Sequence, residues 1–365
     1  MKRLTLGDVC KKASSNIAQK DLQDKIGAYP IYGASGLIKQ VDFYQQDKEY
    51  IAVVKDGAGI GRTMLLPAYS SVIGTMQYLL PKEGIPIDFK YLFYAVEHMN
   101  LAKYFSGATI PHIYFKDYQK EPINIPDIDT QRKISRIFDK IDALIISRKE
   151  QRTRLDQIVK SRFIEMFGVY PANPMGWEIG TIRDIVTEVR YGSSRPAVDG
   201  GKYPYLRMNN ITYGGELDLS DTKRIDIPDN ELDKCTVRRG DVLFNRTNSK
   251  ELVGKTCVYD RDEMMVLAGF VIRIRVKDCI LPEFLSAFLN TDFSKQMLLG
   301  MCKTAIGQAN INAQELQNIG LYLPPVELQR RFIQFKKETD KSKYRQEKCI
   351  GFFQCLEKSI RQEWL

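Results

Sequence analysis

The chain repeats itself at an offset of 198 residues (324 − 126), and this repeat constrains its fold more than any other feature. Residues 126–134 (PDIDTQRKI) align without a gap with residues 324–332 (PPVELQRRF), and Ile113 in the lead-in falls at the same offset onto Ile311. Each copy then enters a long charged segment without proline. An internal duplication of this kind predicts two similar halves related by a pseudo-twofold axis.

The length of the chain agrees with two domains. At 365 residues, of which 44% are hydrophobic, it exceeds the usual size of one compact core. We predict domain 1 at residues 1–126 and domain 2 at residues 177–324. Short β-like runs such as 50–54 alternate with turns and a helix around 89–98, so the predicted class is α+β.

Two long helices are predicted, at residues 127–168 and 325–365, with a linker at 169–176 between the first helix and domain 2. A helix of ~40 residues spans ~60 Å. A heptad-like apolar pattern predicts that the two helices pack as an antiparallel coiled coil that separates the domains. The alternative, that each helix packs only on its own domain, would leave much of its apolar stripe in water. The predicted packing positions are Ile134, Ile137, Ile141, Leu144, Leu155, Ile158, Phe332, Phe335, Phe353, Leu356 and Ile360.

Charge and cysteine usage limit the possible partners. The net charge of +9, from 54 Lys and Arg against 45 Asp and Glu, suggests an anionic partner. The seven cysteines form no C-x-x-C pair, which argues against a zinc site or a disulfide framework and for a cytoplasmic protein. Because no stretch approaches ~18 uninterrupted apolar residues, we expect no membrane partner.

Motifs for catalysis are incomplete. Residues 55–62 (KDGAGIGR) lack the G-x-G-x-x-G spacing, and residues 254–256 (GKT) lack the earlier glycine of a Walker A motif, where Ser249 stands. Residues 221–223 (DTK) are a faint nuclease-like D-x-K that a solvated loop explains equally well. The only two histidines have no counterparts in the second half. We therefore expect no catalytic residue, no metal and no cofactor in this chain.

Polar and basic side chains suited to DNA lie in equivalent loops of the two halves, since residues 61–63 (GRT) correspond to 254–256 (GKT). Arginine pairs with guanine and asparagine with adenine, while lysine contacts phosphates, although any one of these side chains is more often an ordinary surface residue. The candidate DNA-binding residues are Lys55, Arg62, Arg207, Asn209, Asn210, Asn245, Arg246, Asn248, Lys250, Lys255 and Gln308.

Two α+β domains, each ended by a Pro-x-x-x-x-Gln-Arg segment that leads into a long helix, resemble the specificity (S) subunit of type I restriction-modification enzymes. The resemblance covers essentially the whole chain. Particular matches are residues 29–36 (YPIYGASG), 240–246 (GDVLFNR), 304–311 (TAIGQANI) and 323–332 (LPPVELQRRF). A departure is residues 110–113 (IPHI) in domain 1, where domain 2 has the more typical sequence.

The resemblance implies two target-recognition domains that each read one half of a split sequence in double-stranded DNA, with the helices as a spacer. Half-sites would be about one turn of ~34 Å apart, or a multiple of it. Implied partners are two methylation (M) subunits and restriction (R) subunits, which would hold S-adenosylmethionine, ATP and Mg²⁺. Two alternatives remain: the specificity module of a type IIB- or IIG-like restriction-modification enzyme, and an inactive or phase-shuffled scaffold.

Overall fold

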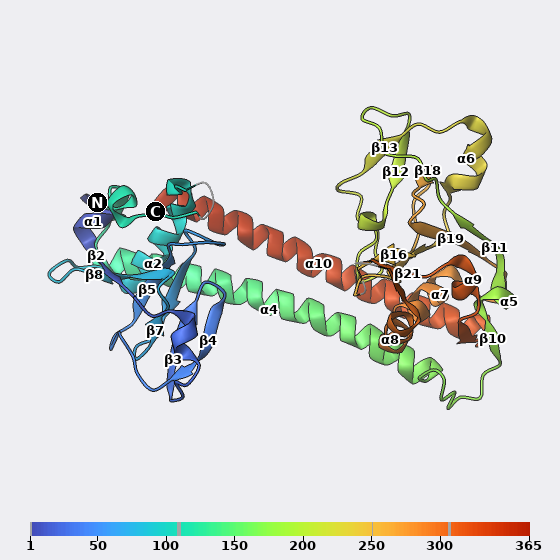
Figure 1. Cartoon of the computed structure of the whole chain (residues 1–365), viewed down its shortest axis with the longest axis horizontal. Coiled ribbons are helices and arrows are strands. Elements are labelled where there is room, and N and C mark those ends of the chain that lie inside the picture. Colours follow the sequence, from blue (N-terminus) through green and yellow to red (C-terminus); the bar gives the residue numbers. More distant parts are fainter. Residues whose placement is uncertain (1, 108–110, 250, 306–307) are drawn as a thin grey trace. The chain divides into compact units, whose positions relative to one another are not determined.

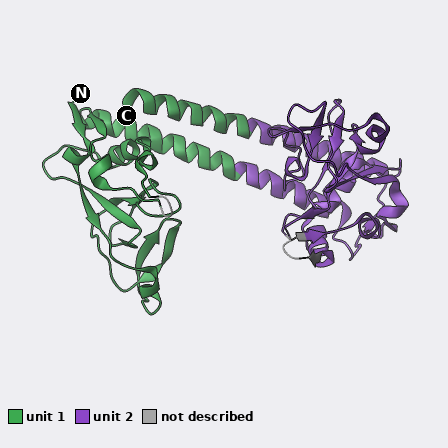
Figure 2. Ribbon diagram, turned by 45° about the horizontal axis from the view of Figure 1, so that its top comes forward, with its two compact units in different colours: residues 1–150, 346–365 green, residues 151–345 purple. Residues whose placement is uncertain are grey.

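The computed structural model describes residues 2–107, 111–249, 251–305 and 308–365, without the side chains of 303–305 and 308. The chain forms two compact units (Figure 2). Unit 1 comprises residues 1–150 and 346–365, and unit 2 comprises residues 151–345. The division, marked by the two colours of Figure 2, falls within the two long helices that Figure 1 labels α4 and α10. Each unit therefore contains one domain together with one part of each helix.

Unit 1 begins with a small α+β domain. Its elements are β1 (Lys2–Thr5), α1 (Leu6–Val9), β2 (Cys10–Ser14), the 3-10 helix η1 (Gln19–Leu22), β3 (Tyr29–Gly33), β4 (Gly36–Val41), β5 (Tyr50–Val54), β6 (Thr63–Leu66), β7 (Ser71–Val72), β8 (Met76–Pro81), α2 (Phe89–His98), η2 (Leu101–Tyr104), α3 (Phe115–Tyr118) and β9 (Pro122–Ile125). The long helix α4 (Ile128–Phe167) follows. The described strands form sheets of order β2-β8-β5-β6, β4-β3-β7 and β1-β9.

Unit 2 repeats this arrangement. Its elements are β10 (Ile179–Thr181), α5 (Ile182–Ile185), β11 (Val186–Tyr191), β12 (Tyr203–Leu206), η3 (Met208–Asn210), β13 (Lys223–Ile225), α6 (Asp229–Cys235), β14 (Thr236–Val237), β15 (Val242–Asn245), β16 (Thr247–Asn248), β17 (Thr256–Val258), β18 (Met265–Leu267), β19 (Val271–Val276), α7 (Pro282–Leu289), α8 (Asp292–Met301), β20 (Lys303–Ala305), β21 (Gln308–Asn310), α9 (Ala313–Gln317), β22 (Gly320–Tyr322) and α10 (Val326–Trp364). The described strands form sheets of order β11-β19-β15-β17, β13-β12-β18-β14, β10-β22 and β16-β21-β20.

The strand pairings of the two units correspond. The central strands β5 and β15 each pair antiparallel with both neighbours in a four-stranded sheet. In the second sheet β3 runs parallel to β7, as β12 does to β18. The predicted fold class is confirmed in this respect, because the two α+β domains share one topology.

The repeated Pro-x-x-x-x-Gln motif has a structural cause. The Gln131 side chain, which is fully buried, accepts a hydrogen bond from Asp88 N (2.8 Å) and donates to Pro86 O (3.1 Å) and Pro126 O (2.8 Å). In unit 2, Gln329 likewise accepts from Leu281 N (2.8 Å) and donates to Cys279 O (3.2 Å) and Pro324 O (2.7 Å). Each glutamine therefore ties the start of a long helix to the loop before α2 or α7.

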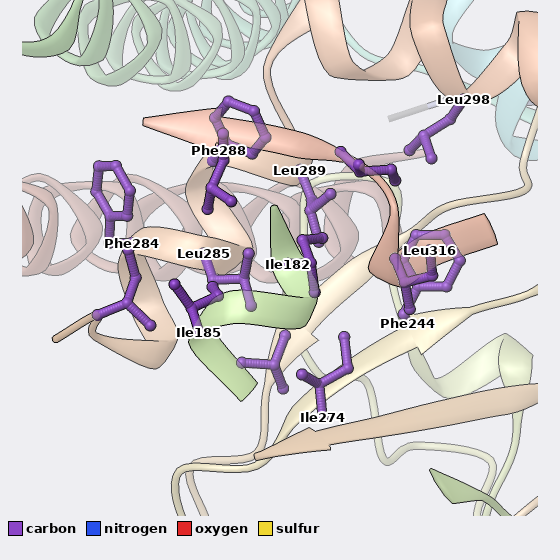
Figure 3. Close-up of a cluster of buried hydrophobic side chains, with 14 of the residues drawn as sticks. Ile182, Ile185, Phe244, Ile274, Phe284, Leu285, Phe288, Leu289, Leu298 and Leu316 are labelled. Carbon is purple, nitrogen blue, oxygen red and sulfur yellow. The ribbon is translucent and has the colours of Figure 1, made fainter. Parts of the chain in front are cut away.

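The long helices supply part of both hydrophobic cores. In unit 2 the rings of Phe163 and Phe167 from α4 lie 5.2 and 5.7 Å from the ring of Phe332 on α10. All three belong to the same buried cluster as Phe284 and Leu285, which Figure 3 labels. In unit 1 the side chains of Ile134 and Phe138 join the core, and Ile360 of α10 packs against it. Both helices thus pack on both domains, and the alternative in which each helix packs only on its own domain is wrong.

The helices run antiparallel, because the start of α4 pairs with the end of α10 in unit 1 and the reverse holds in unit 2. In unit 1, Arg148 Nη1 donates to Gln346 Oε1 (3.3 Å), and the Arg361 guanidinium lies 5.1 Å from the centre of the Phe138 ring. In unit 2, Lys343 Nζ lies 2.8 Å from Asp156 Oδ1. The pairing predicted from the heptad pattern is therefore present in each unit.

The buried positions of the long helices differ in part from the packing positions that were predicted. The exposed fractions of Ile137, Leu144, Ile158 and Leu356 are 40%, 40%, 48% and 38%. The buried apolar residues at the start of α4 are Ile134, Phe138, Ile141 and Ile145, spaced four, three and four apart. The prediction used spacings of three, four and three, so it named Ile137 and Leu144 in place of their neighbours Phe138 and Ile145, which are the buried residues. Leu155, Phe335, Phe353 and Ile360 are half-buried, and Phe332 is buried.

Candidate nucleic-acid interface

The strongest candidate site lies where the central strand of each domain ends in a cation. Ile113 N donates to Lys55 O (2.9 Å) after β5, and Ile311 N donates to Arg246 O (2.9 Å) after β15. The two acceptors therefore occupy equivalent positions, although the sequence analysis had not matched them to each other. Each cation begins the loop that leads to the next strand.

The glycine that closes each loop is required by the backbone. Gly61 N donates to Val54 O and Gly254 N to Asn245 O, both at 2.8 Å, and φ is 78° at Gly61 and 79° at Gly254. A Cβ at Gly61 would lie 2.3 Å from Ala102 N, and one at Gly254 would lie 2.6 Å from Leu298 Cδ1. These glycine-containing loops are thus tight connections between strands, packed against the domain.

The basic residues after these glycines make the same bond in both domains. Arg62 Nη1 donates to Ala34 O and Lys255 Nζ donates to Met208 O, both at 2.9 Å. Burial lowers the pKa of the Lys255 ammonium, which is 7% exposed. Lys255 is therefore a buried cross-link, which corrects its prediction as a phosphate contact, whereas Arg62 is exposed.

Two further candidate DNA-binding residues, Arg207 and Asn210, are bonded to other residues of domain 2. The Asn210 side chain is buried, accepts from Arg207 N (2.8 Å), and donates to Asp218 O (2.8 Å) and Asp221 O (3.2 Å). Arg207 Nη2 lies 2.9 Å from Asp221 Oδ2. Asn210 is therefore a scaffold residue, which corrects its prediction as a base contact, and the D-x-K aspartate is a partner of Arg207. Asn209 is exposed.

Arg246 is half-buried and lies against an aromatic ring. Its guanidinium carbon lies 4.7 Å from the centre of the Tyr191 ring, and its buried Nε has no hydrogen-bond partner among the described residues. Tyr191 and Phe270 are exposed beside it, with Arg246 N donating to Phe270 O (3.0 Å). Asn248 is half-buried, and its Oδ1 accepts from Ser249 N (2.9 Å).

Asn245 is fully buried at the end of β15, and neither Nδ2 nor Oδ1 has a partner among the described residues. Its equivalent in domain 1 is the buried Val54. Because its side chain is inaccessible, Asn245 does not contact DNA at the surface, which corrects its prediction as a DNA-binding residue. Lys250 lies outside the described residues, as does the side chain of Gln308 in β21.

Domain 1 holds a polar pair that the sequence analysis did not single out. His112 Nδ1 lies 2.6 Å from Asp56 Oδ1, and Lys55 Nζ lies 3.5 Å from Asp56 Oδ2. The sequence repeat could have pointed to this pair, since His112 corresponds to Asn310 at the same offset (310 − 112 = 198). Asn310 is also bonded, because its Oδ1 accepts a hydrogen bond from Thr247 Oγ1 (3.3 Å).

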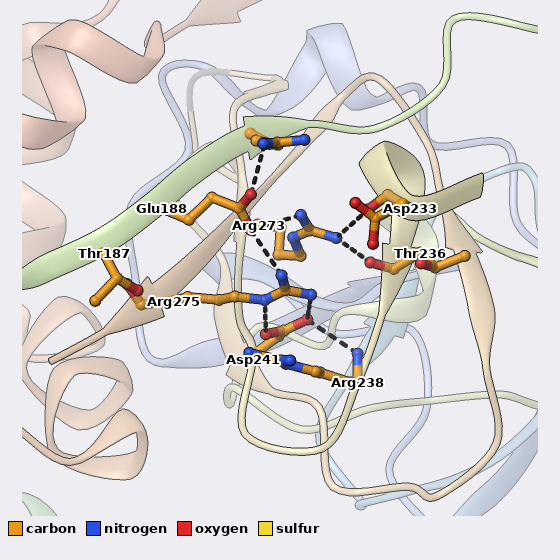
Figure 4. Close-up of polar contacts among 9 residues, drawn as sticks. Thr187, Glu188, Asp233, Thr236, Arg238, Asp241, Arg273 and Arg275 are labelled. Carbon is orange, nitrogen blue, oxygen red and sulfur yellow. Dashed lines mark hydrogen bonds and ion pairs between the residues drawn. The ribbon is translucent and has the colours of Figure 1, made fainter. Parts of the chain in front are cut away.

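A largely buried ionic network connects strands of the four-stranded sheet that contains β15 (Figure 4). Arg273 Nη2 and Arg275 Nη1 donate to Glu188 Oε2 at 2.7 and 2.8 Å, and Arg275 Nε donates to Asp241 Oδ1 at 2.9 Å. Burial lowers the pKa of the Arg273 guanidinium, which is 1% exposed. The ion pairs link Glu188 of β11 to the two arginines of β19, and Arg275 to Asp241 just before β15.

Two classes of feature are missing from the described part of the chain. It contains no group of three or more His, Cys, Asp and Glu side chains placed to hold a metal ion. None of its helices is both long and apolar enough to cross a membrane.

Comparison with known proteins identifies the family. The family model described as Type I restriction modification DNA specificity domain matches residues 1–157 and again residues 174–348. Since these two matches cover most of the chain, the protein belongs to this family of specificity domains. The two matches coincide with the two repeated domains and part of each long helix.

Individual relatives agree with the family match. The specificity subunit of type I restriction enzyme EcoKI from Escherichia coli K12 is 25% identical over 244 residues, which are 62% of this chain and 52% of that protein. The MjaVIII specificity subunit from Methanocaldococcus jannaschii is 25% identical over 317 residues, or 80% of this chain and 72% of that protein. The chain spans about half the length of the first of these relatives.

Solved structures share the fold over nearly the whole chain. The S subunit of a type I restriction-modification system from M. genitalium superposes with a TM-score of 0.55 at 14% identity, covering 100% of this chain and 96% of that one. A chain from a structure of complex assembly and conformational transition in a type I system gives 0.61 at 16% identity, covering 99% and 96%. The repeated α+β domains with long helices are therefore the fold of this group.

Proposed function

We propose that the chain is the specificity subunit of a type I restriction-modification complex, and that each domain reads one half of a bipartite DNA sequence. The observation that carries this proposal is the equivalent placement of Lys55 and Arg246 at the ends of β5 and β15, set by matching backbone hydrogen bonds. The side chains around them differ, as expected of two readers with different half-sites. The net charge of +9 favours a polyanionic partner.

The residues proposed to touch DNA are those that the domains leave accessible. Arg246 is assigned to a base edge, and Lys55 and Arg62 to phosphates, which position a protein without specifying sequence. Asn209 and Asn248 are secondary candidates for base contacts. Arg207 is assigned a lesser part, because Asp221 already neutralises it.

The chain is proposed to be non-catalytic and cytoplasmic, with chemistry in its partners. Two methylation subunits would dock on the long helices, where Ile137, Leu144, Ile158 and Leu356 leave apolar surface exposed. Restriction subunits would join them. S-adenosylmethionine, ATP and Mg²⁺ belong to those subunits in this proposal.

The test is to co-express the chain with the methylation subunit of its own locus and to map adenine methylation in the host genome by single-molecule sequencing. The proposal expects a split motif, two short blocks around a fixed gap, that disappears when the gene is deleted. A stable complex that directs no motif would instead identify an inactive scaffold. Methyltransferase and nuclease activity in one fused partner chain would favour the type IIB- or IIG-like alternative.

The same assay separates the domains. Arg246→Ala is expected to relax one block of the motif and leave the other unchanged, whereas Lys55→Ala is expected to lower methylation of the whole motif without relaxing either block. If Arg246→Ala altered both blocks equally, the assignment of one half-site to each domain would be wrong.

A further inference from the structure

Arg246 emerges from a backbone that is fixed on both sides. Its amide donates to Phe270 O (3.0 Å) and its carbonyl accepts from Ile311 N (2.9 Å). Phe270 and Ile311 belong to segments far apart in sequence from β15, so three parts of domain 2 hold this one residue. The direction in which the side chain leaves the sheet is therefore set by the fold.

Tyr191, at the end of β11, is fixed in the same way. Its hydroxyl accepts a hydrogen bond from Ala313 N (2.8 Å), while 42% of the residue is exposed. The next residue is Gly192, where a Cβ would lie 2.1 Å from Leu267 O, so the backbone passes too close to β18 for any side chain. The ring is thus held at its hydroxyl end and at its backbone, with one face toward Arg246 at 4.7 Å.

The described residues of domain 1 do not form this arrangement. Tyr191 pairs with Ile272 in β11–β19, and the equivalent pair in β2–β8 is Ser14 with Gln77. Lys55, the counterpart of Arg246, lies 3.5 Å from the Asp56 carboxylate. Among the described residues that follow the two central strands, a guanidinium stacked on a ring of the edge strand is therefore found at Arg246 and not at Lys55.

We propose that Tyr191 is a positioning residue that holds Arg246 so that its guanidinium reads a guanine in the half-site of domain 2. This inference rests on the proposed function of the chain. A guanidinium that stacks on an aromatic face keeps its planar edge free, and that edge matches the O6 and N7 acceptors of guanine. Stacking also limits the rotamers of a long side chain, so less freedom is lost when the base is bound.

The experiment measures discrimination at each base pair of the motif, as the ratio of Kd values for matched and substituted duplexes, with the assembled complex. Arg246→Lys is expected to reduce discrimination at one G·C pair by about 5- to 100-fold, while affinity for unrelated DNA stays the same. Tyr191→Leu is expected to reduce it at the same pair by about 3- to 10-fold. Tyr191→Phe, which keeps the ring, should retain most of it.

A double-mutant cycle distinguishes positioning from a general structural effect. If Tyr191 acts through Arg246, Tyr191→Leu will cause no further loss in the Arg246→Lys background. The matched control is Tyr213→Leu, which removes another exposed tyrosine of domain 2 whose ring lies 5.7 Å from a cation, Lys295. This control should leave discrimination unchanged at every position.

The outcomes are distinct. Equal losses from Tyr191→Leu on matched and unrelated DNA, or additive losses in the double mutant, would overturn the positioning role. Arg246→Lys that leaves every position unchanged would overturn the guanine contact. If the complex with Tyr191→Leu does not assemble, Arg246→Lys still tests the guanine contact, and Tyr191→Phe still tests whether the ring without its hydroxyl retains discrimination. A wild-type complex that directs no split motif would instead remove the proposed function itself.

Discussion

Domain 1 and domain 2 fill equivalent positions of the same sheet with opposite chemistry. The β5–β8 and β15–β19 registers make Tyr50 equivalent to Asp241 and Tyr78 equivalent to Arg273. In domain 1 the two rings meet edge to face at 4.9 Å. In domain 2 the same places hold members of the ionic network with Glu188.

The difference shows what the shared topology requires. Tyr50 needs one partner for its hydroxyl, Ser70 Oγ at 2.8 Å, and burial raises its pKa. Arg273 needs a carboxylate and backbone acceptors, because a buried charge without partners is strongly unfavourable. The strand order tolerates either solution, but the second depends on several residues being present together.

The largest effect is expected from breaking the ionic network. Asp241→Leu removes one of the two carboxylates that pair with Arg275 and leaves Glu188 to pair with both Arg273 and Arg275, so it should destabilise unit 2 by about 3–5 kcal/mol. Tyr50→Phe, which removes one hydrogen bond in domain 1, should cost about 1 kcal/mol. The two tryptophans report the units separately, since Trp177 lies in unit 2 and Trp364 in unit 1.

Urea unfolding followed by fluorescence in Trp364→Phe and Trp177→Phe backgrounds measures each unit. Similar losses in Asp241→Leu and Tyr50→Phe would show that the two interiors are equally tolerant, contrary to the comparison.

The next effect tests where the domains are alike. Gln131→Ala and Gln329→Ala each remove three hydrogen bonds to backbone groups, one of which, the carbonyl of Pro126 or Pro324, is buried, so both should destabilise their own unit by about 2–3 kcal/mol. The same fluorescence measurement applies. A large effect in one unit alone would mean that the repeated motif no longer has the same role in both halves.

The third effect concerns DNA. Arg246→Ala should cost about 1–3 kcal/mol at one base pair, whereas Lys55→Ala should weaken binding to all sequences and lower the slope of log K against log salt by about 1. Titrations at several salt concentrations, with duplexes substituted one pair at a time, check both. Base-specific loss from Lys55→Ala would show that the two cations play the same part.

The smallest effect is a pH dependence of unit 2. Burial lowers the pKa of Lys295, whose Nζ donates to Gly254 O (2.7 Å), to about 8. Between pH 8 and 10 the unfolded chain binds more protons at this lysine than the folded one, so stability should rise by about 1–2 kcal/mol. Lys295→Met should flatten this rise in the Trp177 signal, and a fall over that range in wild type would contradict the assignment.

The sequence alone determined the repeat, the two domains and the two long helices. These follow from local signals, since in both halves a proline followed by a long charged run without proline indicates the start of a helix. The correspondence of Gly61 with Gly254 was also visible, because both loops follow an apolar strand.

The tertiary structure alone decided which polar residues face inward. Lys255 and Asn210 belong to the scaffold because segments distant in sequence supply their partners, such as Met208 for Lys255. The buried seam passes through Phe138 because the core of domain 1 lies on that side of α4. Tyr191 meets Arg246 only because β11 and β15 flank β19 in one sheet, and a contact of this kind leaves no periodic signal in the chain.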